Sequence, residues 1–296
     1  LYFDFSGYSD MAIGLARMFG ITLPVNFSSP YKANNIAVFW QRWHITLSRL
    51  IRDYVYYPAT LFATRYAVIR NYNSISVFIL TILLPTMFAY FWVGLWHGAG
   101  WNFILFGLAH GTYVVIYSAW VKIKKNIPDN RVIKSTVIAN SIGRVVTFLA
   151  VVPSLVLFRA ESMDGVSNML TAMLSGHGLS LPPSLIGRIG YLEQWLLEHG
   201  VVFHGMFHNH VFGPNPKWGI AWVVALLLAS MFLPNTQQLL RRYRPVLKIY
   251  KNEVPRLRHR WIEWRPTIPW AFFTFGIFII TILSLEQASE FLYFQF

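Results

Sequence analysis

The stretch VGLWHGAGWNFILFGLAHG, residues 93–111, decides the fold of this chain. It contains no charged residue, yet it holds two histidines, His97 and His110, among tryptophan, phenylalanine, leucine and glycine. The apolar runs 75–95 and 101–121 are each long enough to cross a bilayer, which takes a helix of about 20 residues. The stretch therefore predicts two transmembrane helices, with glycines breaking the helix between them.

The composition indicates a membrane protein along the whole chain. Of the 296 residues, 55% are hydrophobic and only 12% are charged, against about 25% charged residues in a typical soluble domain. Three further apolar runs, at 142–158, 218–233 and 269–285, bring the expected spans to five. The chain has no cysteine, which excludes disulfides, thiolate zinc sites and a cysteine nucleophile. We predict an all-α polytopic integral membrane protein.

The net charge of +13 gives the orientation of these spans. Lysine and arginine concentrate on the cytoplasmic side of membrane proteins. Residues 1–74, 122–144 and 241–265 carry 22 of the 25 basic residues, whereas 159–217 carries three. We therefore predict that the three basic segments are cytoplasmic and that 159–217 is an extracytoplasmic loop. Because the positive charge follows the loops between apolar runs, no nucleic-acid partner is expected.

The segment FWQRWHITLSRLIRDYVYYP, residues 39–58, is too charged to cross lipid freely. At about 100° per residue, its aromatic and aliphatic side chains share one stripe. Arg49 and Asp53 lie opposite that stripe, four residues apart, and His44 and Arg52 flank it. The pattern predicts an amphipathic or re-entrant helix whose aromatic face is buried.

Three histidines are candidate functional residues, because an ionisable side chain at membrane depth is costly and usually faces a cavity or a partner. His97 has glycines on both sides, which let a backbone or a substrate approach closely. Each histidine also has a structural alternative. His97 can be an interfacial residue beside a turn, His110 can form a hydrogen bond between helices, and His44 can mark the boundary of an amphipathic helix. The residues alone favour His97 without excluding these alternatives.

The expected outer loop carries a second group of histidines in EHGVVFHGMFHNH, residues 198–210. His204 and His208 have the i, i+4 spacing of zinc ligands, with His210 beside them, but the HExxH pattern is absent. Motifs of serine hydrolases and P-loop proteins are absent too, and no acidic residue lies within an expected span. We therefore expect no metal site, and histidine is the remaining candidate base.

Six blocks of this sequence resemble the membrane-bound O-acyltransferase family, and within it the alginate O-acetyltransferase branch. The resemblance runs from one end of the chain to the other. The blocks are LYFDFSGYSDMAIGLARMFGI (1–21), NFSSPYKANNIAVFWQRWHITLSRLIRDYVYYP (26–58), GLWHGAGWNFILFGLAHG (94–111), FRAES (158–162), LPNTQQLL (233–240) and SEFLYFQF (289–296).

The resemblance implies roles for particular residues. The histidine of the GLWHG element, His97, falls on the family's catalytic histidine, and the histidine of the RWH element, His44, falls on the second implicated one. Further residues follow from the same motifs: His110, Trp96 and Trp43 as supporting residues, and Arg42, Arg49 and Arg52 as contacts to phosphates of the donor.

The resemblance also implies a reaction. An acetyl group would pass from a cytoplasmic thioester, acetyl-coenzyme A or an acyl carrier, to a hydroxyl of an extracytoplasmic, alginate-like polysaccharide. His97 would be the general base, at the bottom of an intramembrane funnel formed by transmembrane and amphipathic helices. The implied partners are the polysaccharide or a periplasmic acetyltransferase protein, together with membrane lipid, and no cofactor would remain bound.

Other functions remain open beside this reaction, and the chain can be divided into regions. Transfer to peptidoglycan or a teichoic-acid-type polymer remains open, as does a non-enzymatic acyl or solute transporter. The expected location is the bacterial inner membrane, crossed several times. We expect one domain over 1–296, the C-terminal portion of a longer chain, with 1–74 cytoplasmic or re-entrant, 75–158 as catalytic spans, 159–217 as outer loop and 218–296 as C-terminal spans.

Overall fold

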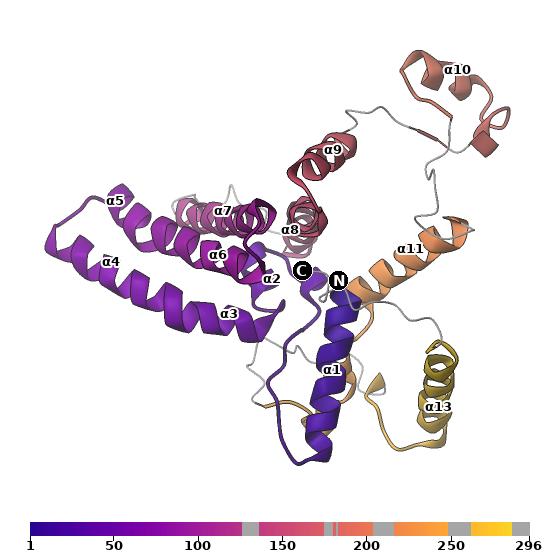
Figure 1. Ribbon diagram of the computed structural model, residues 1–296, viewed down its shortest axis with the longest axis horizontal. Helices are drawn as coiled ribbons and strands as arrows, with labels where there is room; N and C mark the ends of the chain where they lie inside the picture. The colour runs from indigo at the N-terminus through magenta and orange to yellow at the C-terminus, as the bar shows by residue number, and fades with distance from the viewer. Residues whose placement is uncertain (126–135, 175–179, 182, 204–215, 248–261, 286–296) are drawn as a thin grey trace.

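The computed structural model describes residues 1–125, 136–174, 180–181, 183–203, 216–247 and 262–285 (Figure 1). Within these ranges the chain is helical, with two isolated β-bridges and no strand, which confirms the all-α class. The α-helices are α1 (Tyr2–Met18), α2 (Ile36–Trp40), α3 (Ile45–Ile51), α4 (Tyr57–Ile69), α5 (Ser74–Phe78), α6 (Leu84–His97), α7 (Trp101–Lys124), α8 (Thr136–Arg159), α9 (Met163–Met173), α10 (Tyr191–Glu198), α11 (Pro216–Phe232), α12 (Thr236–Leu239) and α13 (Ile268–Leu283). The 3-10 and π-helical turns are η1 (Pro30–Lys32), η2 (Arg52–Tyr56), η3 (Ile79–Leu83), η5 (Pro183–Leu185) and η6 (Arg241–Tyr243).

Three of the five expected spans are confirmed as helices long and apolar enough to cross a membrane. They are Ser74–His97, Trp101–Lys124 and Val137–Arg159. The other two expected spans form α11 and α13, which are apolar but have only 17 and 16 residues. A perpendicular crossing takes about 20 residues, so these two helices are short for a span.

The two spans of the stretch 93–111 form a hairpin. α6 ends at His97, the chain turns through 98–100, and α7 packs back along α6 in the most extensive helix contact of the described structure. A side chain at Gly107 would overlap the backbone carbonyl of Tyr90, so the two backbones approach this closely only because the residue is glycine. α8 packs against α7 and completes a three-helix group.

The expectation of one helix over 39–58 is wrong, because the structure breaks it. α2 ends at Trp40 and α3 begins at Ile45. Between them His44 has φ 42° and ψ 55°, a left-handed conformation that a right-handed helix cannot contain. A left-handed residue other than glycine is uncommon and persists where its surroundings hold it.

Hydrogen bonds to an earlier segment hold the turn 41–44 in place. The Ser28 amide donates to the carbonyl of Arg42 at 2.9 Å, and the Ile45 amide donates to the carbonyl of Asn26 at 2.9 Å. The Asn26 side chain accepts a further bond from the Thr46 hydroxyl at 2.9 Å. These contacts come from about 14 to 20 residues upstream, beyond the reach of helical periodicity.

After the break the helix continues past the expected end at residue 58. α3, η2 and α4 form one bent helix from Ile45 to Ile69, which lies beside α5 and α6 (Figure 1). Its apolar stripe is buried at Leu47 but exposed at Tyr54, so the predicted burial of the aromatic face holds only near the start. Asp53 pairs with Arg52 at 2.8 Å.

Two prolines explain the π-helical turns. η2 ends two residues before Pro58, and η3 ends two residues before Pro85. A proline within a helix lacks the amide hydrogen, and its ring clashes with the carbonyl four residues earlier. The wider π turn gives that carbonyl room, so both helices bend without ending.

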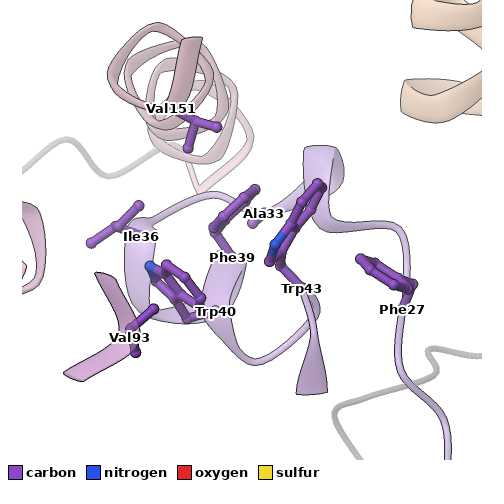
Figure 2. Close-up of a cluster of buried hydrophobic side chains, with 8 residues drawn as sticks. All are labelled: Phe27, Ala33, Ile36, Phe39, Trp40, Trp43, Val93 and Val151. Carbon is purple, nitrogen blue, oxygen red and sulfur yellow. The ribbon is translucent and has the colours of Figure 1, made fainter. Parts of the chain in front are cut away.

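The buried core joins the segment around α2 to the spans. Figure 2 shows Phe39 and Trp40 near Val93 of α6 and Val151 of α8, with Trp43 on the far side of Phe39 toward Phe27. The rings of Phe39 and Trp43 stack with centroids 5.6 Å apart. Burial of each large apolar side chain contributes about 1.5–3 kcal/mol, so this aromatic cluster fixes the broken segment against α6 and α8.

Candidate functional site

His110 of α7 is 1% exposed, and both nitrogens of its ring are hydrogen-bonded. The indole N–H of Trp40 donates to Nδ1 of His110 at 3.3 Å. Nε2 of His110 lies 2.8 Å from the hydroxyl of Ser154 in α8. That hydroxyl donates its own proton to the carbonyl of Val151 at 2.6 Å, so it accepts a hydrogen bond from Nε2–H.

These bonds assign His110 as a neutral imidazole with its proton on Nε2. Because one nitrogen donates and the other accepts, neither is available to take a proton from a substrate. His110 connects α2, α7 and α8, which favours the structural alternative of a hydrogen bond between helices. It can support the neighbouring site by holding these helices in place.

His97 has a different environment, although it lines the same small gap as His110. It is the last residue of α6, and Gly98 follows with φ 157° and ψ 164°, a backbone that side chains rarely adopt. The imidazole packs edge-on against Phe158 at 4.9 Å and Phe106 at 5.7 Å between ring centroids. It is half-buried, and no hydrogen bond joins its ring nitrogens to a residue of the described ranges.

His44 is the residue before α3 and presents a second open nitrogen. Its Nδ1 lies 3.5 Å from the hydroxyl of Thr46, and that hydroxyl donates its proton to Asn26. This arrangement favours a proton on Nδ1 of His44 and a lone pair on Nε2. Nε2 is buried and has no hydrogen-bond partner in the part of the chain that the structure describes.

Burial lowers the pKa of the His44 imidazole to about 4. The imidazole is surrounded by rings, with Phe5 at 4.8 Å and Trp96 at 5.5 Å between centroids. An apolar environment disfavours the charged form of an imidazole. His44 is therefore neutral at physiological pH, with one nitrogen able to accept a proton or a hydrogen bond.

Trp96 connects the two histidines that have open nitrogens. Its ring lies 5.5 Å from that of His44 and 4.8 Å from that of His97, edge-on to both. The structure thus brings together the two histidines from segments about fifty residues apart. Trp43, the other tryptophan singled out, is buried and packs against Phe27 at 5.2 Å, so it contacts the core beside His44.

A large cavity lies beside α2 and does not include the histidines. It has a volume of about 610 Å³, its walls come from α2, α3, α6 and α7, and Arg49 and Arg52 line it. None of the three histidines lines this cavity. His97 and His110 instead line a separate gap of about 10 Å³, which is at the lower limit for one water. The funnel that ends on the histidines stays a prediction.

The three arginines expected to contact a donor are separated by the structure. Arg49 and Arg52 line the cavity of about 610 Å³, whereas Arg42 lies in the turn before His44 and does not line it. Nε of Arg42 is buried without a hydrogen-bond partner among the described residues.

Two residues of the site were not predicted from the sequence. Asn26 holds the turn that carries His44, and Ser154 orients His110. Asn26 belongs to the NFSSP block, which is a usable signal, but Ser154 is one serine in an apolar span and has none. Of the outer histidines only His199 is described, and it stacks on Trp195 with centroids 4.1 Å apart. His204, His208 and His210 lie outside the described residues.

Comparison with known proteins identifies a protein family that this chain matches. The sequence profile described as membrane-bound O-acyltransferase family matches residues 1–157, which include all three histidines. A probable alginate O-acetylase of Pseudomonas putida is 32% identical over the whole chain, which covers 51% of that protein. A peptidoglycan O-acetyltransferase of Helicobacter pylori is 38% identical over 61% of the chain and 31% of that protein.

A third relative has a different activity. A teichoic acid D-alanyltransferase of Streptococcus thermophilus is 37% identical over 44% of the chain and 30% of that protein. The chain spans at most about half the length of these relatives.

Proposed function

We propose a function from one premise: this chain belongs to the membrane-bound O-acyltransferase family. It is a membrane protein, with three helices apolar and long enough to cross a bilayer. It transfers an acetyl group from a thioester to a hydroxyl of an extracytoplasmic, alginate-like polysaccharide. The observation that carries this proposal is the pair of histidines with open nitrogens, His97 and His44, joined by Trp96.

His97 serves as the general base in this proposal. Its neutral imidazole takes the proton of the acceptor hydroxyl while the hydroxyl oxygen attacks the thioester carbonyl carbon. The new C–O bond forms, the C–S bond breaks, and the proton returns from His97 to the departing thiolate. Atoms and charge balance without a metal or a bound cofactor. The position of His97 beside the glycine-containing turn 98–100 supports this role, since residues without side chains let a substrate approach closely.

His44 orients the reacting hydroxyl. The lone pair expected on Nε2 accepts a hydrogen bond, which suits a hydroxyl better than an oxyanion. Stabilising an oxyanion, the other role implied by the resemblance, requires the opposite tautomer. The contact of Thr46 with Nδ1 therefore favours orientation.

The donor is acetyl-coenzyme A or an acyl carrier on the cytoplasmic side. The cavity of about 610 Å³ supports this assignment because it combines apolar walls with Arg49 and Arg52. An acyl chain or pantetheine arm suits the walls, and guanidinium groups suit phosphate. The acceptor is the polysaccharide itself or a periplasmic acetyltransferase partner that passes the acetyl group on. The location is the bacterial inner membrane, crossed several times, with the basic segments inside.

The test uses the full-length protein in its own cells, with His97→Ala beside the unchanged protein. We expect the acetate content of the extracted polysaccharide to fall by about 100-fold or more, at normal membrane abundance, because loss of a general base costs 10²–10⁴-fold. Membranes incubated with labelled acetyl-coenzyme A should label the polysaccharide or a partner protein only with His97 present. Unchanged acetate in the variant would refute the base, and a label absent from both would refute this donor.

Peptidoglycan is the second candidate acceptor, favoured by the 38% identity to the Helicobacter pylori protein. The same cells distinguish the two acceptors, because ester-linked acetate is measured separately on purified peptidoglycan and on the secreted polysaccharide. A transporter would behave differently from either enzyme. Detergent-solubilised protein would then transfer no acetyl group, and His97→Gln would reduce only flux across sealed vesicles.

A further inference from the structure

A group of three basic side chains lines neither the cavity of about 610 Å³ nor the gap of about 10 Å³ beside His97. Lys32 ends η1, Arg42 lies in the turn before His44, and Arg144 lies in α8. The contact of α8 with η1 brings them together. The Asn34 amide donates to the Asn140 side chain at 2.6 Å, and Gly143 lies directly against the carbonyl of Asn34.

The positive charges of these side chains act on one another. Burial lowers the pKa of Lys32, and the charges of Arg42 and Arg144 lower it further. Burial likewise lowers the pKa of Arg42, with Arg144 again adding to the effect. Over the described ranges no carboxylate acts on Lys32 or Arg42 in the opposite direction. Three cations in mutual repulsion, two of them half-buried, are unfavourable without a counter-ion.

The hydrogen bonds of the group leave donors open toward an anion. Lys32 donates one hydrogen to the carbonyl of Leu233, just after α11, which uses one of its three donors. Nε–H of Arg42 is buried and has no partner in the described structure. Arg144 is exposed and supplies a third charge from the surface of α8. A buried donor without a partner costs about 1–3 kcal/mol, so a ligand that accepts from it would be stabilised there.

We propose that Lys32, Arg42 and Arg144 form a phosphate-binding site on the cytoplasmic side of the protein. Guanidinium groups bind phosphate through paired, charge-assisted hydrogen bonds, and an ammonium adds a compact charge. All three residues come from segments that the distribution of basic residues assigns to the cytoplasm. The phosphate belongs either to the thioester donor or to an anionic phospholipid, and the site distinguishes neither. Only the first source rests on the proposed acyl transfer.

The test measures binding without turnover in the full-length protein, reconstituted in nanodiscs. Coenzyme A is titrated in discs of phosphatidylcholine alone, and retained phosphatidylglycerol is counted by native mass spectrometry from discs that contain both lipids. The variant is Lys32→Gln with Arg144→Gln, which leaves Arg42 in place and removes two charges. The matched control is Arg65→Gln with Arg70→Gln, which removes two exposed charges of the same predicted side.

We expect the double variant to bind at least one of the two probes about tenfold more weakly than the control does. A loss for coenzyme A assigns the phosphate to the donor, and a loss for phosphatidylglycerol assigns it to lipid. Binding of both probes within about twofold of the control overturns the site, as does a wild-type protein that binds neither. Arg144→Gln alone, at an exposed position, gives a folded variant for the same comparison, and Arg144→Lys should restore binding. These experiments measure binding and no acetyl transfer. The phosphate site can therefore be supported or refuted whether or not the proposed enzyme activity is found.

Discussion

The α6–α7 hairpin holds two neighbouring histidines of opposite character, His97 at the end of α6 and His110 within α7. His110 is buried with both ring nitrogens hydrogen-bonded, to Trp40 and Ser154. His97 is half-buried and has no hydrogen bond to a described residue, and His44 beside Trp96 has a buried Nε2 without a partner. Both environments are aromatic, so apolar packing does not distinguish them. The difference lies in the hydrogen bonds.

This difference in hydrogen bonding distinguishes a histidine that stabilises the fold from histidines that can act on a substrate. A histidine whose donor and acceptor are both used contributes to folding, because its loss leaves other buried groups unpaired. A histidine with an open nitrogen contributes little to folding through that nitrogen and keeps it for a substrate. We therefore expect substitutions of the two kinds of histidine to affect different measurements.

The largest expected effect on stability is at His110. His110→Ala removes a buried ring and leaves the Trp40 N–H without its acceptor, so we expect the free energy of unfolding to fall by about 3 kcal/mol. His97→Ala should lower it by clearly less, because no hydrogen bond to the described residues is lost. Thermal unfolding of both variants in detergent micelles makes the comparison. Equal losses would mean that His97 is as structural as His110.

A smaller effect is expected from pH at His44. The folded pKa of about 4 lies below the usual value of about 6.5, so the unfolded chain binds the proton first as pH falls. Stability from the neutral His44 is complete above pH 6.5 and decreases toward pH 4, by at most about 1.4 kcal/mol per pH unit.

His44→Asn is the matched variant for this measurement, because asparagine tolerates the left-handed backbone and does not titrate here. We expect the difference in unfolding free energy between wild type and variant to decrease from pH 7.5 to pH 5. A difference that stays constant over this range would contradict the burial of a neutral imidazole at this position.

The smallest expected effect is at Ser154. Ser154→Ala removes the acceptor of the Nε2–H of His110 and should lower the free energy of unfolding by about 1 kcal/mol, with acetate transfer nearly unchanged. Urea unfolding followed by tryptophan fluorescence measures the first, and the polysaccharide assay measures the second. A large loss of transfer with full stability would place Ser154 in the chemistry and would remove the contrast between His110 and His97.

The helical spans were predictable because hydrophobicity is a local property. The runs 75–95, 101–121 and 142–158 correspond to helices that extend each run by only a few residues. The break before α3 was not predictable from periodicity. The apolar residues around His44 recur with the period of a helix. The left-handed turn exists because Asn26 and Ser28, earlier in the chain, form hydrogen bonds with it.

The site was predictable in its membership but not in its roles. Residues and resemblance together singled out His97, His44 and His110, and the structure brings the first two into contact with Trp96. The donor arginines were expected to act together. Instead Arg49 and Arg52 line the large cavity, while Arg42, in the turn between α2 and α3, is grouped with Lys32 and Arg144.

The sequence by itself determined the membrane class, the expected orientation and the short set of candidate histidines, because these depend on the hydropathy, charge and motifs of contiguous residues. Only the tertiary structure decided which histidine keeps a nitrogen open. The partners of His110 lie 70 and 44 residues away in the chain, and no pattern within one helix records a hydrogen bond made across three. Satisfaction of a buried imidazole is a property of the packed neighbours, so it becomes defined only when α2, α7 and α8 meet.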